Sequence, residues 1–191
     1  RADAPLAVLG PGTGLGASGL LPAPGGWFAI AGEGGHVSLP ALDEREDAIL
    51  RVLRRRFGHV SAERVLSGSG LVRLARAFDP DASRHAPETI AASALAREPA
   101  AQAAARLFAR LLGRFAGSLA LTFKALGGVY VTGGVASGLA PLLSEPAFRA
   151  AFETHPPYEA LLRAIPTLLI TCEQPGLIGC AALSGEHALA V

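Results

Sequence analysis

The sequence predicts an α/β protein built on a mixed sheet, with the order β-β-β-α-β-α-β-α. Short apolar runs bounded by glycine and proline occur at both ends of the chain, whereas helical periodicity dominates residues 43–126. The later strands alternate with helices, which is typical of parallel pairing, and the opening strands follow one another directly. We therefore expect an antiparallel opening, a parallel continuation, helices on both faces of the sheet and a helical insertion at 43–126.

The opening segment is predicted to form three strands, at residues 6–9, 17–21 and 27–30. Pro22-Ala23-Pro24-Gly25-Gly26 separates the last two, and this composition is a strong turn signal, so they should form a hairpin. A loop at 31–36 and a brief extended piece at 37–39 complete this part.

The middle of the chain is predicted to be helical. The expected helices cover residues 43–57, a short stretch that begins at Ser61 and carries Glu63, and residues 70–78, 87–97 and 99–126. Asp43 followed by Glu46 resembles a capping box, Ser61 and Ser69 are expected to cap the next two helices, and prolines occupy the first turns of the last two. Gly113 and Gly117 should let another helix approach the longest one closely.

The closing segment returns to alternating elements. Strands are expected at 128–132 and 165–171, and helices at 139–143, 146–152 and 175–189.

Composition restricts the class of protein. The 191 residues include 17 basic and 16 acidic residues, so no basic surface for nucleic acid is expected. Arg54, Arg55 and Arg56 follow an acidic stretch on one predicted helix, which favours a solvated helix face. The most apolar long segment, 100–126, carries several basic residues and is not a membrane span.

The two cysteines, Cys172 and Cys180, lack metal-ligand spacing and lie in apolar segments. We interpret them as buried free thiols of a cytoplasmic protein, although a disulfide between them stays open.

A glycine-rich turn follows the first strand: Gly12-Thr13-Gly14-Leu15-Gly16. Glycine lets the backbone approach an anion, and free N–H groups and the Thr13 hydroxyl can donate hydrogen bonds to phosphate oxygens. The turn is neither a Walker A sequence nor a dinucleotide fingerprint, so an ordinary tight turn is the alternative.

A second glycine-rich loop places two polar side chains, Glu33 and His36, within Gly32-Glu33-Gly34-Gly35-His36. Paired acceptors and donors suit sugar hydroxyls, which both donate and accept hydrogen bonds. A solvated loop is the alternative, and one His with one Glu supplies too few ligands for a metal.

Two further segments are candidates for a binding site. Glu63 is expected in the first turn of its helix, where the helix dipole alone could explain a carboxylate. Gly133 and Gly134 follow a buried strand, and ligands of α/β sheets collect at the carboxyl ends of strands. A flat base could lie over the two glycines, and a plain strand-to-helix turn is the alternative.

Taken in order and spacing, these segments resemble the ATP-dependent glucokinases of bacteria, which share the actin-like ATPase (ribonuclease H-like) fold. The resemblance covers nearly the whole chain, and it rests on 12–16, 32–37, 58–68, 127–134 and 175–179. The Cys-rich zinc motif of the related repressor and sugar-kinase family is absent from the sequence.

The resemblance implies a role for each segment. Gly12, Thr13, Gly14 and Gly16 would hold the phosphates of ATP, accompanied by Mg²⁺, and Gly133 and Gly134 would border the adenine. Glu33, His36 and Glu63 would bind glucose hydroxyls, so the implied reaction is phosphorylation of glucose to glucose 6-phosphate.

The resemblance also implies a division into lobes. The family's Asp-x-Gly-Gly-Thr loop and its Asn-Asp pair, which supplies the catalytic base, do not occur here, and Asp3 and Asp43 are poorly placed substitutes. The chain thus resembles the larger C-terminal lobe, with a core of 1–42 and 127–191, and is expected to be nearly inactive without the N-terminal lobe.

Other readings stay open at this point. Another hexose could be the substrate, or the fold could serve a sugar-sensing regulator without catalysis. The partners implied are glucose, ATP, the N-terminal lobe and a second copy of the chain, with the apolar helices at 99–126 as a candidate dimer surface. Nucleic acid and membranes are not expected partners.

Overall fold

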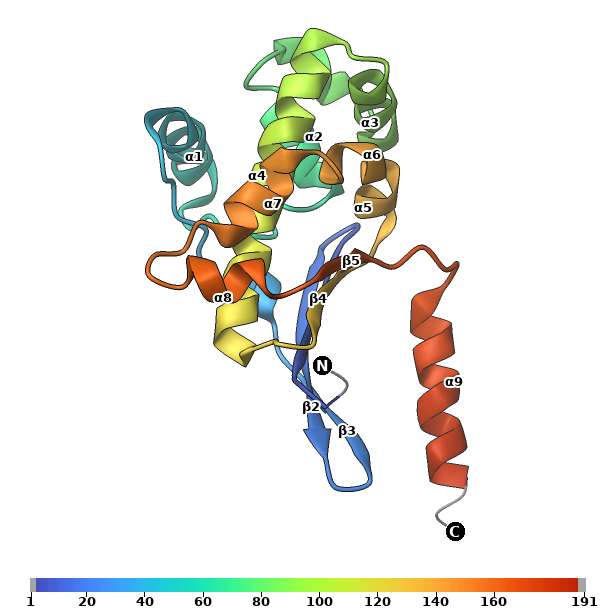
Figure 1. The fold of residues 1–191 in the computed structure, drawn as a ribbon. Coiled ribbons are helices and arrows are strands. Elements are labelled where there is room, and N and C mark those ends of the chain that lie inside the picture. The colour runs from blue at the N-terminus through green and yellow to red at the C-terminus, as the bar shows by residue number, and fades with distance from the viewer. Residues whose placement is uncertain (1–2, 189–191) are drawn as a thin grey trace.

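The computed structural model describes residues 3–188 and contains one five-stranded mixed sheet (Figure 1). Its strands are β1 (Leu6–Pro11), β2 (Leu15–Ala23), β3 (Gly26–Ile30), β4 (Gly128–Val131) and β5 (Thr167–Leu169). They lie in the order β3-β2-β1-β4-β5, and β1 pairs antiparallel with β2 but parallel with β4. The predicted antiparallel opening and parallel continuation are confirmed.

Helices fill the segments between and after the strands. In chain order they are η1 (Gly34–His36), α1 (Glu44–Phe57), α2 (Gly68–Ala75), η2 (Pro80–Arg84), α3 (Pro87–Leu95), α4 (Pro99–Phe123), α5 (Gly134–Gly138), α6 (Ala140–Leu143), α7 (Pro146–Glu153), α8 (Glu159–Arg163) and α9 (Pro175–Ala188). The sequence did not predict η1, η2, α5 or α8, which are short. The last residue predicted for the closing helix, 189, lies outside the described residues.

The core lies between the sheet and α4. Alternate residues of β1 and β4 are buried, among them Leu9 and Val131, and they join α4 side chains such as Phe108 in one hydrophobic cluster. Most of α4 is therefore interior. Few apolar side chains of this helix stay available for the dimer surface predicted at 99–126, because most of them are buried within the chain.

Close packing of α4 against α7 depends on two glycines, as predicted. A methyl group on Gly113 would collide with the backbone carbonyl of Phe148. One on Gly117 would lie 2.5 Å from the Phe152 carbonyl oxygen. Neither position has room for a side chain, so the backbones of the two helices lie directly against each other.

A buried ion pair joins α1 to α4. Glu46 and Arg114 are almost completely buried, and their nearest atoms, Oε2 and Nη1, lie 2.9 Å apart. Asp43 caps α1 by accepting from the Glu46 N–H at 2.8 Å, as predicted, and it also pairs with Arg110. The capping residue of α1 thereby takes part in the contact between the two helices.

Two expectations about surfaces are corrected. Cys172 and Cys180 are exposed, not buried, because the segment after β5 leaves the sheet and α9 stands clear of it (Figure 1). Residues 171–182 are exposed apart from the half-buried Pro175, so α9 does not form a second helical layer over the sheet. Arg54, Arg55 and Arg56 form a solvated face in the last turn of α1, as predicted.

No helix among residues 3–188 combines the length and the apolar composition that crossing a bilayer requires.

Candidate functional site

The glycine-rich turn is shorter than predicted, because both flanking strands extend into it. β1 continues to Pro11 and β2 starts at Leu15, so Gly12, Thr13 and Gly14 alone connect them. Gly16 lies in β2, opposite Gly10 and outside the turn. The Thr13 side chain is exposed at the tip, where its hydroxyl can meet a ligand.

Gly133 and Gly134 lie close to this turn because β1 and β4 are neighbours in the sheet. β1 and β4 are parallel, so their carboxyl ends, and the loops that follow, lie at the same edge. Gly133 has a φ of +94°, and a methyl group on it would lie 2.5 Å from the Pro11 carbonyl oxygen. Only glycine fits this close approach, and Gly134 next to it has open space around its Cα.

Glu63 joins the turn to the second glycine-rich loop. Its Oε2 accepts the Leu15 N–H at 3.0 Å, and its own N–H donates to the Gly35 carbonyl at 2.8 Å. A methyl group on Gly14 would lie 2.5 Å from Glu63 Oε2, so the carboxylate packs directly against the turn. The carboxylate is therefore held beside the turn, and about a third of the side chain remains exposed.

His36 faces the same carboxylate. Its Nε2 lies 3.9 Å from Glu63 Oε1, and more than half of its side chain is exposed. Gly35, next to it, lies directly on the backbone of Leu15, which fixes the loop against β2. His36 and Glu63 thus form a pair of polar groups open to solvent at the edge of the turn.

Glu33 is placed differently from its partners. It precedes η1 and its carbonyl accepts the His36 N–H at 2.9 Å, but its side chain is exposed and makes no hydrogen bond or ion pair with the described residues. The structure brings together the side chains of His36 and Glu63, and the Glu33 side chain, on the same loop, forms no hydrogen bond or ion pair with either.

The predicted helix around Glu63 is wrong. The Ala62 and Glu63 N–H groups donate across to the Val37 and Gly35 carbonyls, so residues 61–66 form turns instead of a helix. The next helix, α2, is capped by Ser67 and not by Ser69: the Ser67 hydroxyl accepts the Gly70 N–H at 3.1 Å. The position of Glu63 owes nothing to a helix dipole.

The start of α2 also contacts the glycine-rich turn, which the sequence did not indicate. The Gly68 N–H donates to the Gly12 carbonyl at 2.8 Å, and the Gly68 Cα lies against Pro87 of α3. A Gly-x-Gly pattern after a serine cap could have signalled a close backbone contact, but not which segment makes it.

A cavity of about 230 Å³ continues from Gly134 along α3 and α5. Its walls are largely apolar: Leu71, Pro87, Glu88, Ala91, Ala92, Leu95, Gly134, Val135 and Gly138. A flat, mostly apolar group fits such a space. The cavity-lining residues of α2 and α3 were missed at the sequence level, because the long insertion separates them from Gly134.

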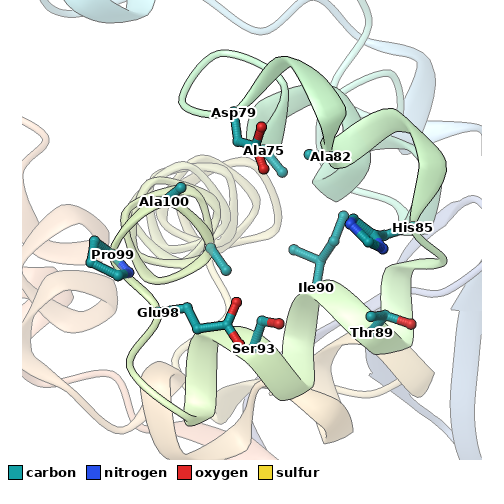
Figure 2. Close-up of a pocket in the computed structure, with 11 residues that line it drawn as sticks. Ala75, Asp79, Ala82, His85, Thr89, Ile90, Ser93, Glu98, Pro99 and Ala100 are labelled. Atoms are coloured by element: carbon teal, nitrogen blue, oxygen red, sulfur yellow. The ribbon is translucent and has the colours of Figure 1, made fainter.

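A second cavity, of about 300 Å³, lies on the other side of α3 (Figure 2). Thr89, Ile90 and Ser93 of α3 face it, together with Asp79 and Glu98. None of the residues predicted to bind a ligand lines this cavity, so α3 separates it from the site around Gly134.

The described residues do not include a metal centre of their own. No three His, Cys, Asp or Glu side chains among residues 3–188 cluster closely enough to hold an ion. The turn offers N–H groups and a hydroxyl, which suit phosphate oxygens and not a cation. The described residues therefore do not form a cage of protein ligands around a cation.

Comparison with known proteins places these motifs in a family. A sequence profile of the glucokinase family matches residues 1–187. The glucokinase of Chromobacterium violaceum is 47% identical over 192 aligned positions, which cover 98% of this chain and 55% of that protein. The chain thus spans about half the length of this relative.

Solved structures agree with the sequence comparison. A glucokinase from an Antarctic psychrotroph aligns with a TM-score of 0.85 and 33% identity, over 96% of this chain and 58% of that one. A glucokinase of Balamuthia mandrillaris, described in complex with glucose, aligns with a TM-score of 0.75 and 24% identity, over 89% and 51% of the two chains. The second likeness supports the actin-like fold alone.

Proposed function

This chain belongs to the glucokinase family, and we propose that it supplies the sugar-binding residues and part of the nucleotide site of an ATP-dependent glucose kinase. The observation that carries the proposal is the position of Glu63. Its carboxylate binds the Leu15 N–H beside the phosphate-type turn and also faces His36, so it connects the two halves of the site.

The sugar side of the proposal rests on exposed polar groups. Glu63 Oε1, His36 and Glu33 offer acceptors and a donor at one edge of the site, and a glucose ring presents hydroxyls that do both. With Oε2 engaged by the backbone, Glu63 would orient a sugar hydroxyl with Oε1.

The nucleotide side rests on the turn and the adjoining cavity. Thr13 and Gly14 would hold phosphate oxygens through their N–H groups and the Thr13 hydroxyl, and Gly12, whose N–H donates to the Gly14 carbonyl at 2.9 Å, would shape the turn. The base would lie over Gly133 and Gly134 and enter the cavity of about 230 Å³ next to α3. Both parts lie at the carboxyl ends of β1 and β4, where ligands of such sheets collect.

Phosphoryl transfer also needs a base for the sugar hydroxyl and a cation on the phosphates. No cluster of three metal ligands occurs among the described residues, so we propose that Mg²⁺ is held mainly by the phosphate oxygens of ATP. We further propose that the catalytic base belongs to an N-terminal lobe, that residues 1–42 and 127–191 form the core of the larger lobe, and that the reaction takes place in the cytoplasm.

Replacement of Glu63 tests the proposal. In the complete glucokinase that carries this chain, Glu63→Gln keeps an oxygen for the Leu15 N–H but removes the charge that would bind glucose. We expect the KM for glucose to rise about tenfold or more, the loss of one charge-assisted hydrogen bond. The KM for ATP should change little, and both would be measured by coupled detection of ADP.

Glu44→Gln is the matched control, because Glu44 is an exposed carboxylate in the first turn of α1. It should leave both KM values unchanged. An unaltered KM for glucose in Glu63→Gln, with a normal fold by circular dichroism, would remove Glu63 from the sugar site.

A further inference from the structure

An arginine-rich groove lies between α1 and α2, apart from the proposed kinase site. Three arginines line it, Arg56, Arg73 and Arg76, and two more, Arg45 and Arg64, lie outside its lining, over the rings of Phe78 and Phe57. None of them has a carboxylate within 4.0 Å in the part of the chain that the structure describes. Arg51 and Arg54 on the same helix behave differently, since both pair with Asp47.

Three of these arginines gather on a single ring. The guanidinium carbons of Arg56, Arg64 and Arg73 lie 5.1, 4.5 and 5.2 Å from the centre of the Phe57 ring. The aromatic face attracts each cation, but it does not neutralise the repulsion among them. The arrangement concentrates positive charge at one end of the groove.

The pKa of Arg73 is consistent with this excess of positive charge, and its hydrogen bonds fix its position. Partial burial lowers the pKa of its guanidinium, and the neighbouring Arg64 and Arg56 lower it further, whereas the Glu63 carboxylate offsets part of this effect. Arg73 is also held in place, because its Nη1 donates to the Arg64 carbonyl and to the Ser69 hydroxyl, both at 2.9 Å. The cluster is thus built on fixed groups and not only on freely moving surface side chains.

The groove beside the cluster has room for a ligand. Its volume is about 470 Å³, and Arg56, Arg73 and Arg76 border it. Apolar side chains of α1 form the opposite wall, among them Ile49, Leu53 and Val52, of which the last is 65% exposed.

We propose that this groove binds an anion that carries more than one phosphate group. Guanidinium groups match phosphate oxygens in pairs, and an anion with several charges would relieve the repulsion among several arginines at once. An acidic amphipathic helix is the other class of partner for an apolar groove with a basic rim. The convergence of three guanidinium groups on one ring favours the compact phosphate ligand.

The proposed anion site is linked to the kinase site through Arg73. The carbonyl that Arg73 holds belongs to Arg64, the residue directly after Glu63. A ligand that moved the Arg73 guanidinium away from this carbonyl would therefore shift the turn that positions the Glu63 carboxylate. The binding proposal itself stands apart from the kinase proposal, because it needs no glucose, no ATP and no turnover.

Calorimetric titration with inorganic tripolyphosphate tests the site. Arg56→Gln together with Arg76→Gln removes two charges from the groove and leaves Arg73 and its hydrogen bonds in place. Arg55→Gln together with Arg84→Gln removes two exposed charges elsewhere and serves as the control. We expect the groove variant to bind tripolyphosphate at least tenfold more weakly than the wild type, and the control variant to bind it equally well.

Two further arms separate the alternatives. Because the glycine-rich turn is also proposed to hold phosphates, the titration is repeated with Thr13→Ala in each variant, and the tenfold difference between the groove and control variants should persist there. Equal affinity in the groove and control variants would overturn the proposal. So would binding of an acidic amphipathic peptide that depends on Arg56 and Arg76 when tripolyphosphate does not bind.

Discussion

At the scale of single residues, the candidate site is defined by contacts that only small or charged residues can make. Glu63 accepts a backbone N–H with one oxygen and leaves the other toward His36. Gly133 has no room for a side chain, because a Cβ would meet the Pro11 carbonyl, and a Cβ on Gly14 would displace Glu63 Oε2. These two glycines bring three separate segments together at one point.

Gly14→Ala tests whether that close approach matters for function. The added methyl group would lie 2.5 Å from Glu63 Oε2, so the carboxylate must move away from its backbone partner. In the complete enzyme we expect the KM for glucose to rise several-fold, with a loss of stability of about 1 kcal/mol from the displaced hydrogen bond between Glu63 Oε2 and the Leu15 N–H. Enzyme kinetics and urea unfolding measure the two effects.

Gly16→Ala is the control for this substitution. Gly16 has no heavy atom within 4 Å of a built Cβ and lies in β2, so alanine there should change neither the KM for glucose nor the stability by a comparable amount. If the two substitutions changed the KM for glucose and the stability equally, the contact with Glu63 would not be the cause of either effect.

At the scale of elements, the packing of α4 against α7 and the segment after it organises the helical half. Gly113 and Gly117 admit α7, and His155 lies over Gly117. The His155 Nε2 is 3.3 Å from the Ser118 hydroxyl, and its buried Nδ1 has no hydrogen-bond partner within the described residues. A charged imidazole at this position would lack a partner for one of its two N–H groups.

The pKa of His155 gives this packing a pH dependence. Burial lowers it below the usual value, and Arg114 lowers it further, whereas Glu159 and nearby carbonyls partly offset the effect. The unfolded chain therefore takes up a proton at a higher pH than the folded chain. Stability contributed by neutral His155 is fully present above the unfolded pKa of about 6.5 and is lost as the pH falls toward the folded pKa.

Replacement of His155 should reduce this dependence. We expect the free energy of unfolding to fall less between pH 7.5 and pH 5.5 in His155→Gln than in the wild type, as measured by urea titration at both values. His85→Gln removes an exposed histidine at the end of η2 and should retain the wild-type slope. Parallel slopes in the wild type and His155→Gln would exclude His155 as the source.

At the scale of the whole molecule, the sheet has one face covered by helices and α9 stands apart. Leu177 and Ile178 of α9 are exposed, as is Leu168 of β5. The chain spans 55% of the length of the Chromobacterium violaceum glucokinase, so the proposed reaction calls on more residues than the 191 present. The proposed lobe division is a statement about that larger protein.

Activity of the isolated chain tests the division. We expect purified residues 1–191 to release little or no ADP from ATP in the presence of glucose, because the proposed base lies outside them. Addition of the complete glucokinase to the same assay is the positive control. Sustained ADP production that depends on both substrates, from the isolated chain alone, would contradict the division into lobes.

The fold was predictable in outline because local patterns carry it. Three local signals each act over a few residues: the capping box at Asp43 and Glu46, the Pro-rich turn before Trp27, and the prolines that open α3 and α4. The elements that these signals predicted are all present. Prediction failed where hydrogen bonds run between distant segments. Residues 61–66 looked helical, but the N–H groups of Ala62 and Glu63 are taken by carbonyls of residues 37 and 35.

The sequence by itself determined the strand order along the chain, the glycine-rich turns and the polar residues between them, because short-range sterics and hydrogen bonding specify these features. Tertiary structure alone decided that Glu63 reaches Leu15, that Gly133 touches Pro11 and that a cavity opens between α3 and Gly134. It also decided that α4 is core and that both cysteines are exposed. These outcomes depend on which distant segments pack together, and local patterns in a single sequence do not encode that choice.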